Sequence, residues 1–168
     1  VNMIIGRSGS GKTVLLKNIV GLMSPEVGEI YFNKREFVRV EEKQKREIRK
    51  EMGMVFQGSA LFTSSTVEEN VMLPLDFFTK MSKAEKQKRV DFCLDRVNIK
   101  NANKLYPGEI SGGMQKRVAI ARAIALNPKY LFCDEPNSGL DPQTSILIDK
   151  LIKEITVEYN ITTIVHTH

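Results

Sequence analysis

The sequence is poor in cysteine and has no long apolar run, and both features narrow the classes to which it can belong. Its 168 residues include two cysteines, Cys93 and Cys133, which lie in a helical and an apolar stretch. Two isolated cysteines make neither a disulfide framework nor a metal-binding spacing. We therefore expect two small core side chains in a reducing compartment. No apolar run approaches the roughly 18 residues that a membrane span requires, so we expect a chain that does not itself cross a bilayer.

The positively charged residues are concentrated in two stretches of the chain. The net charge of +5 is concentrated in residues 34–50 and 80–104, where Lys and Arg alternate with Glu or Asp. Such mixed runs are typical of solvated helix faces, with contact to anionic lipid headgroups as the alternative. Neither run interleaves aromatic side chains as a single-strand-binding surface does, so we expect no nucleic-acid partner.

Apolar strand-like segments alternate with helical ones. We expect strands over residues 1–5, 28–33, 53–56, 130–133 and 161–165, and helices over residues 12–22, 40–51, 67–72, 83–97, 112–126 and 142–159. Strands that alternate with crossover helices imply an α/β fold with a parallel sheet covered on both faces. The chain begins inside one strand and stops directly after another, so we expect an incomplete domain.

A glycine-rich stretch between the first strand and the first helix predicts a phosphate-binding loop. It runs Gly6-Arg7-Ser8-Gly9-Ser10-Gly11-Lys12-Thr13 and is followed by Val14. The glycines let backbone N–H groups curl around phosphate oxygens, and the helix N-terminus adds a favourable dipole. We expect Lys12 to neutralise the β- and γ-phosphates of ATP and the Thr13 hydroxyl to bind Mg²⁺. A chance match is expected in roughly one chain in a hundred of this length.

Two carboxylates, Asp134 and Glu135, directly follow the apolar run of residues 130–133. A buried parallel strand delivers its last residue to the carboxyl edge of the sheet, where ligands bind in such folds. We expect Asp134 to hold Mg²⁺ through a water, and Glu135 to position the water that attacks the γ-phosphate. A pair of surface acids at a strand end is the alternative.

The turn Ser111-Gly112-Gly113 precedes a helix rich in small apolar residues. Ser111 can cap that helix, and the glycines leave further N–H groups available to an anion. Alone, this turn could be no more than a helix start. Its place between the phosphate loop and the acidic pair makes the chain resemble the nucleotide-binding subunit of an ABC transporter. In that family the turn contacts the γ-phosphate bound on the opposite subunit.

The resemblance covers nearly all of the chain and implies roles for further residues. Gln57 matches the Q-loop glutamine, which senses Mg²⁺ and the attacking water. Asp141 matches the D-loop residue that reaches across the dimer, and His168 matches the switch histidine at the γ-phosphate. His166 is expected to belong to the end of the strand.

The chain also departs from the family pattern. Where the family has Leu-Ser-Gly-Gly-Gln, this sequence has Ile110-Ser111-Gly112-Gly113-Met114, followed by Gln115. The role of the missing glutamine is therefore open. The aromatic residue that stacks on adenine in the family would lie before Val1.

The resemblance also implies an architecture, cofactors and partners. It implies a P-loop NTPase (RecA-like) core of residues 1–57 and 128–168, with a helical signature subdomain of residues 58–127. It implies ATP hydrolysis with Mg²⁺, a head-to-tail dimer with a second copy, and membrane-spanning permease subunits. The expected location is peripheral, on the cytoplasmic face of the inner membrane. The segment Phe62–Phe78 is our candidate groove for the coupling helix of a permease, with an ordinary buried helix–loop pair as the alternative.

Three features look like those of the ATPases of Mla/MCE-type phospholipid transporters: residues 6–17, residues 54–62 followed by residues 66–71, and the Ser-Gly-Gly-Met variant with Lys116-Arg117 after it. They imply phospholipid transport between membranes, with an MCE-domain lipid-binding protein as a further partner. No residue of the chain is expected to touch lipid, so this substrate follows by analogy alone.

Other functions stay open. Within the transporter class, the alternatives are an importer of amino acids or other small solutes and a lipoprotein-releasing ATPase. A soluble ABC ATPase acting on DNA would separate its motifs by a coiled coil, whereas here about a hundred residues without heptads intervene. Ribosome-acting relatives carry two such cassettes in one chain. A P-loop kinase is disfavoured by the Ser-Gly-Gly turn and the Thr-His ending.

Overall fold

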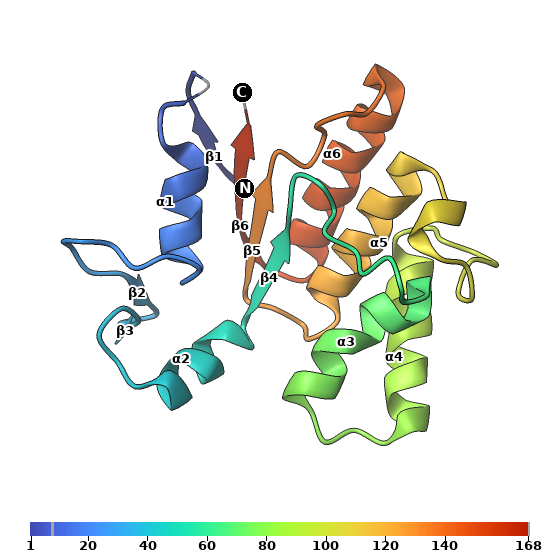
Figure 1. Cartoon of the computed structure of the whole chain (residues 1–168), viewed down its shortest axis with the longest axis horizontal. Helices are drawn as coiled ribbons and strands as arrows, with labels where there is room; N and C mark the ends of the chain where they lie inside the picture. Colours follow the sequence, from blue (N-terminus) through green and yellow to red (C-terminus); the bar gives the residue numbers. More distant parts are fainter. Residues whose placement is uncertain (8, 168) are drawn as a thin grey trace.

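The computed structural model describes residues 1–7 and 9–167 of the chain (Figure 1). The described residues form a four-stranded sheet in the order β1–β6–β5–β4. Its strands are β1 (Asn2–Ile5), β6 (Thr162–Thr167), β5 (Tyr130–Asp134) and β4 (Met52–Val55). All three neighbouring pairs are parallel. The predicted parallel α/β sheet is therefore confirmed.

Helices cover both faces of this sheet, as crossover connections require. In Figure 1, α1 (Lys12–Ile19) lies on one side, and α5 (Gly112–Ile124) and α6 (Pro142–Glu158) lie on the other. Successive residues of β5 point to opposite faces: Phe132 packs with Leu16 of α1, whereas Leu131 and Cys133 join the core beneath α5 and α6. The two layers thereby fix the carboxyl edge of the sheet from both sides.

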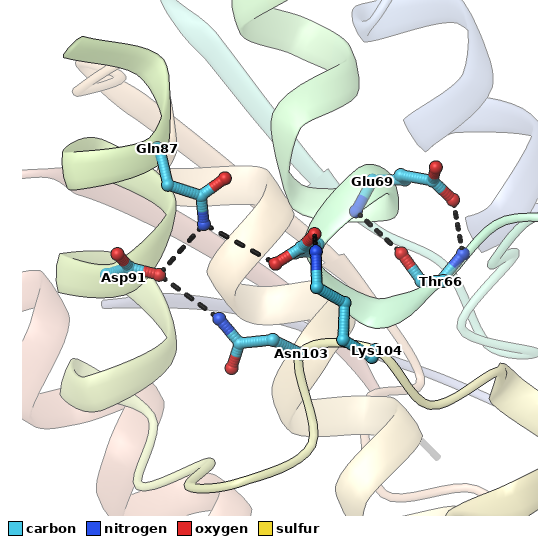
Figure 2. A network of polar contacts seen from close by, with 7 residues as sticks. Thr66, Glu69, Gln87, Asp91, Asn103 and Lys104 are labelled. Carbon is cyan, nitrogen blue, oxygen red and sulfur yellow. Dashed lines mark hydrogen bonds and ion pairs between the residues drawn. The ribbon is translucent and has the colours of Figure 1, made fainter. Parts of the chain in front are cut away.

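The helices between β4 and β5 are α3 (Val67–Phe78), α4 (Lys83–Arg96), the short 3₁₀ helix η1 (Pro107–Glu109) and α5. Capping boxes begin α3 and α4, with Thr66 paired to Glu69 and Ser82 paired to Glu85. Figure 2 shows the first of these pairs. It also shows Asp91 of α4, which accepts hydrogen bonds from Gln87 and from Asn103 at 3.0 and 3.1 Å. Polar contacts thus join α4 to the segment that leads toward the signature turn.

Two sequence expectations were wrong in detail. A helix was expected to end at Met72, but α3 continues through Pro74 to Phe78, because Val71 and Leu75 are buried in the core and hold the helix across the proline. A single strand was expected over residues 28–33. Instead β2 (Tyr31–Phe32) pairs antiparallel with β3 (Arg35–Glu36). Both residues of the connecting turn have positive φ, as a tight hairpin turn requires.

Between β3 and β4 the chain forms α2 (Glu42–Arg49), close to the expected polar helix. Cys93 and Cys133 are both buried and unbridged, as expected. Burial raises the pKa of Cys93 to about 11 and that of Cys133 to about 12. Nowhere in residues 1–7 or 9–167 does a helix have the length and apolarity needed to traverse a membrane.

Candidate functional site

The glycine-rich loop connects β1 to α1 and closes around the side chain of Lys12. The Lys12 ammonium donates to the carbonyl oxygens of Gly6 and Arg7 at 2.5 and 2.8 Å, and the residue is only 7% exposed. Gly9 and Gly11 have φ of 77° and 87°, which side-chain-bearing residues rarely adopt. The loop therefore holds a cation at its centre. Ser8 lies outside the described residues.

The N-terminus of α1 supplies further hydrogen-bond donors beside the Lys12 ammonium. Gly11 is its N-cap and has no side chain with which to accept the N–H groups of the first turn. The loop lines a cavity of about 380 Å³, whose lining residues are Gly9, Ser10, Gly11, Lys12, Thr13, Val14, Gln57, Glu135 and His166. A buried ammonium beside a helix N-terminus suits the phosphates of a nucleotide.

Glu135 lies at the carboxyl end of β5, across this cavity from the loop. Its φ is 44°, a left-handed conformation, and its backbone N–H donates to the carbonyl of His166 at 2.9 Å. Gln57, just after β4, donates from Nε2 to the Glu135 carboxylate at 3.0 Å and to the Ser138 hydroxyl at 3.1 Å. The fold therefore brings the glycine-rich loop together with three other parts of the chain, at Gln57, Glu135 and His166.

Asp134 faces inward from the last position of β5 and is paired with His166 on β6. The two residues are in register across the parallel strands. The distance from His166 Nδ1 to Asp134 Oδ1 is 2.5 Å, and both residues are buried. The other ring nitrogen of His166, Nε2, lies 3.8 Å from Oε1 of Glu135. His166 lies in the strand as expected, but it also lines the cavity, a position that sequence reasoning missed.

The signature turn lies in a different cavity. The Ser111 hydroxyl accepts from the Met114 N–H at 3.2 Å and caps α5. Asp141 caps α6 by accepting from the Thr144 N–H at 3.0 Å. Hydrogen bonding from the Thr144 side chain, together with that backbone bond, lowers the pKa of Asp141. Both caps line a cavity of about 590 Å³, together with Gly112 and Gly113. Among the residues that the structure describes, it shares none of its lining with the cavity of the glycine-rich loop.

The family comparison agrees with this arrangement. A family model described as ABC transporter matches residues 1–138. The chain belongs to the ABC transporter family. Its sequence is 47% identical to the methionine import ATP-binding protein MetN of Clostridioides difficile strain 630, over 98% of this chain and 51% of that protein. It is 39% identical to the probable ribonucleotide transport ATP-binding protein mkl of Mycobacterium leprae strain TN, over 100% of this chain and 48% of that protein.

Solved structures of ABC cassettes have the same fold. The chain matches the dimeric post-hydrolysis state of the ATP-binding cassette MJ0796 bound to ADP and Pi, with a TM-score of 0.88 and 38% identity. The match covers 99% of this chain and 73% of that one. It also matches cbiO1 from Clostridium perfringens, part of the ABC transporter complex cbiONQ, with a TM-score of 0.88 and 35% identity over 99% and 66%. The chain spans about half the length of the curated relatives it matches.

Within this ABC domain, Gln115 does not stand in for the glutamine that Met114 replaces. Its Nε2 donates to the carbonyls of Pro107 and Ile110 at 2.9 and 3.4 Å, so the side chain braces the segment before the signature turn. Met114 is partly buried against the core. The fifth position of this signature therefore offers an apolar side chain where the family pattern has an amide.

The residues expected to bind Mg²⁺ fit such an ion only in part. Within the described ranges, no group of three or more His, Cys, Asp or Glu side chains could hold a metal. Mg²⁺ in nucleotide sites commonly uses one or two protein groups together with phosphates and waters. Thr13 and Gln57 line the cavity, and Asp134 adjoins it through its partner His166. The expected switch histidine, His168, lies outside the described residues.

Proposed function

We propose that this chain is the ATP-hydrolysing motor of an ABC transporter. The observation that carries this proposal is the cavity shared by the glycine-rich loop, Gln57 and Glu135. Lys12 and the N–H groups at the start of α1 would bind the β- and γ-phosphates of ATP. Mg²⁺, when bound by the Thr13 hydroxyl with Gln57 and Asp134, would neutralise charge on the same phosphates.

Hydrolysis requires a water placed in line with the γ-phosphorus. Glu135 would accept a proton from this water as its oxygen bonds to phosphorus and the bond to the bridging oxygen breaks, which yields ADP and phosphate. The Gln57 amide, 3.0 Å from the Glu135 carboxylate, would fix the orientation of that carboxylate. The similarity to a cassette solved with ADP and Pi supports this reaction.

A second copy of the chain would complete the site. The signature turn at Ser111 and the loop at Lys12 line separate cavities, so one copy does not present both to one nucleotide. In a head-to-tail dimer, the Ser111 turn of each copy would meet ATP held by the other, and Asp141 would lie near the contact. The dimeric MJ0796 cassette supports this assembly. Only the closed dimer would contact ATP from both copies. ATP would therefore bind the closed dimer more tightly than the open one, and this difference in affinity would drive closure.

The candidate permease contact is an apolar cavity of about 380 Å³ between β4, α3 and α5. It includes Phe62, Leu73, Pro74 and Phe77 from the segment expected to receive a coupling helix. Phe62 and Phe77 are both more than half exposed. Because large exposed aromatics commonly mark binding surfaces, we propose a permease helix as the occupant. The motor would then lie peripherally, on the cytoplasmic face of the inner membrane.

For the cargo, we propose phospholipid moved between membranes, with an MCE-domain lipid-binding protein as a further partner. The Ser-Gly-Gly-Met signature and the stretches at residues 6–17, 54–62 and 66–71 support this choice. A second candidate is the import of an amino acid or another small solute, favoured by the 47% identity to a methionine import ATP-binding protein.

The test is to purify the full-length subunit with its membrane partners and to identify co-purifying proteins and lipids by mass spectrometry. An MCE-domain protein with bound phospholipid would support lipid transport. A solute-binding protein that binds methionine would favour the second candidate and overturn the first. ATPase activity stimulated by the reconstituted permease would support the motor itself, and activity indifferent to the permease would count against it.

A further inference from the structure

Two cations of helix α5 hold the backbone of the segment that follows β4. The Lys116 ammonium donates to the main-chain oxygen of Gln57. Six residues further along the helix, the Arg122 guanidinium donates to the carbonyls of Ser59 and Ala60 at 2.8 and 2.7 Å. Both cations therefore attach residues 57–60 to the helix that begins at the signature turn.

Lys116 is buried, although lysine is seldom found in a protein interior. It is 4% exposed, and burial lowers its pKa, while the nearby carboxylates of Glu135 and Asp134 act in the opposite sense. A buried ammonium is tolerated where it has a well-placed acceptor, and here the Gln57 carbonyl is that acceptor. The contact is charge-assisted, which makes it about twice as strong as a neutral hydrogen bond.

The segment itself does not favour the shape it adopts. Ser59 and Ala60 have φ of 62° and 49°, two successive residues in the left-handed region. This region is disfavoured for any residue other than glycine, because Cβ comes too close to the following carbonyl oxygen. Contacts from outside the segment must therefore impose this conformation, and the hydrogen bonds from α5 are such contacts.

The constraint reaches the cavity of the glycine-rich loop through one side chain. The Gln57 amide contacts the Glu135 carboxylate at 3.0 Å, so a small shift of the Gln57 backbone would separate them. We propose that Lys116 is a positioning residue that attaches the Gln57 backbone to α5, so that the position of the signature turn determines whether Gln57 reaches Glu135. Lys116 acts on the reaction in this way only if the chain hydrolyses ATP as proposed above.

The test compares Lys116→Met with a matched control in the full-length protein. Lys116→Met keeps the length of the side chain but removes its charge and its donors. Arg89→Met is the control, because Arg89 also donates to backbone carbonyls at the far end of α5, those of its last residue Ile124 and its C-cap Ala125. The measurements are kcat and KM for ATP and, without nucleotide, amide hydrogen exchange in a peptide covering residues 56–61.

We expect Lys116→Met to lower kcat about tenfold, the loss typical of one charge-assisted hydrogen bond, with KM changed less than about twofold. Exchange in residues 56–61 should become faster. Arg89→Met should change neither kcat nor the exchange rate of residues 56–61 by more than about twofold. In a Gln57→Ala background, measured by single turnover, Lys116→Met should lower the rate by less than about twofold, because the side chain through which it acts is gone.

Three results would overturn the proposal: unchanged exchange in residues 56–61, an equal loss of kcat in Arg89→Met, or a full tenfold loss that persists in the Gln57→Ala background. Failure of the proposed function gives a different pattern. A wild-type protein without ATPase activity would remove the proposed reaction, whereas the exchange experiment would still show whether Lys116 holds the Gln57 backbone.

Discussion

Replacing Glu135 with glutamine separates the chemical role of this residue from its structural one. The Glu135 carboxylate accepts a hydrogen bond from Gln57 at 3.0 Å, and the amide oxygen of a glutamine can accept the same bond. The backbone contact to His166 at 2.9 Å does not involve the side chain. Glu135→Gln should therefore keep the geometry of the site and lose only the ability to accept a proton from water.

The expected loss in kcat is about 10²–10⁴-fold, the usual contribution of general base catalysis, which corresponds to roughly 3–5 kcal/mol of activation free energy. ATP affinity should change little, so ATP should accumulate and hold the protein as a dimer. Phosphate release gives the rate, and light scattering after gel filtration with ATP gives the mass. Glu47→Gln, the same change at an exposed site on α2, is the control and should have normal activity. Near-normal hydrolysis by Glu135→Gln would refute the assignment of the base.

Three further predictions concern the nucleotide loop, the core and the thiols. Lys12→Ala should abolish turnover and weaken ATP binding at least about tenfold in filter binding, since it removes the cation at the centre of the loop. Gly53→Ala should lower stability by about 3 kcal/mol, because its Cβ would lie 2.4 Å from a backbone oxygen of α5. In calorimetry Tm should fall by roughly 6–12 °C, whereas Gly58→Ala, with open space around it, should leave Tm nearly unchanged. Cys93 and Cys133 should resist a thiol reagent at pH 8, because both are buried and burial raises their pKa values to about 11 and about 12, which leaves very little thiolate at that pH. Both should react in denaturant; rapid labelling of the folded protein would contradict their burial.

The parallel sheet was predictable because its signals are local. Apolar runs of strand length alternate with helical segments, and right-handed crossovers leave few other ways to arrange them. The glycine-rich loop is local too, since consecutive residues such as Gly9 and Gly11 supply the backbone conformations that it needs. Asp134 and Glu135 were placed at the carboxyl edge by the same reasoning, because a strand of known direction ends there.

Contacts between segments that are distant in the chain could not be predicted from such local signals. The pairing of His166 with Asp134 depends on the register of β5 against β6, which packing of the whole sheet determines. The extension of α3 through Pro74 depends on burial of Leu75, since local propensity favours an end there. The hairpin of β2 and β3 depends on a turn without glycine, whose sequence gives only a weak signal.

The sequence by itself determined which chemical groups the chain carries and the local structures that present them, because a loop, a cap or a strand depends on the conformations of adjacent residues. Tertiary structure decided which of these groups meet. It placed Gln57 against Glu135, attached Lys116 to the Gln57 backbone, and put the signature turn in a separate cavity from the glycine-rich loop. These outcomes depend on how helices and strands far apart in the chain pack together, and no short stretch of sequence encodes that packing.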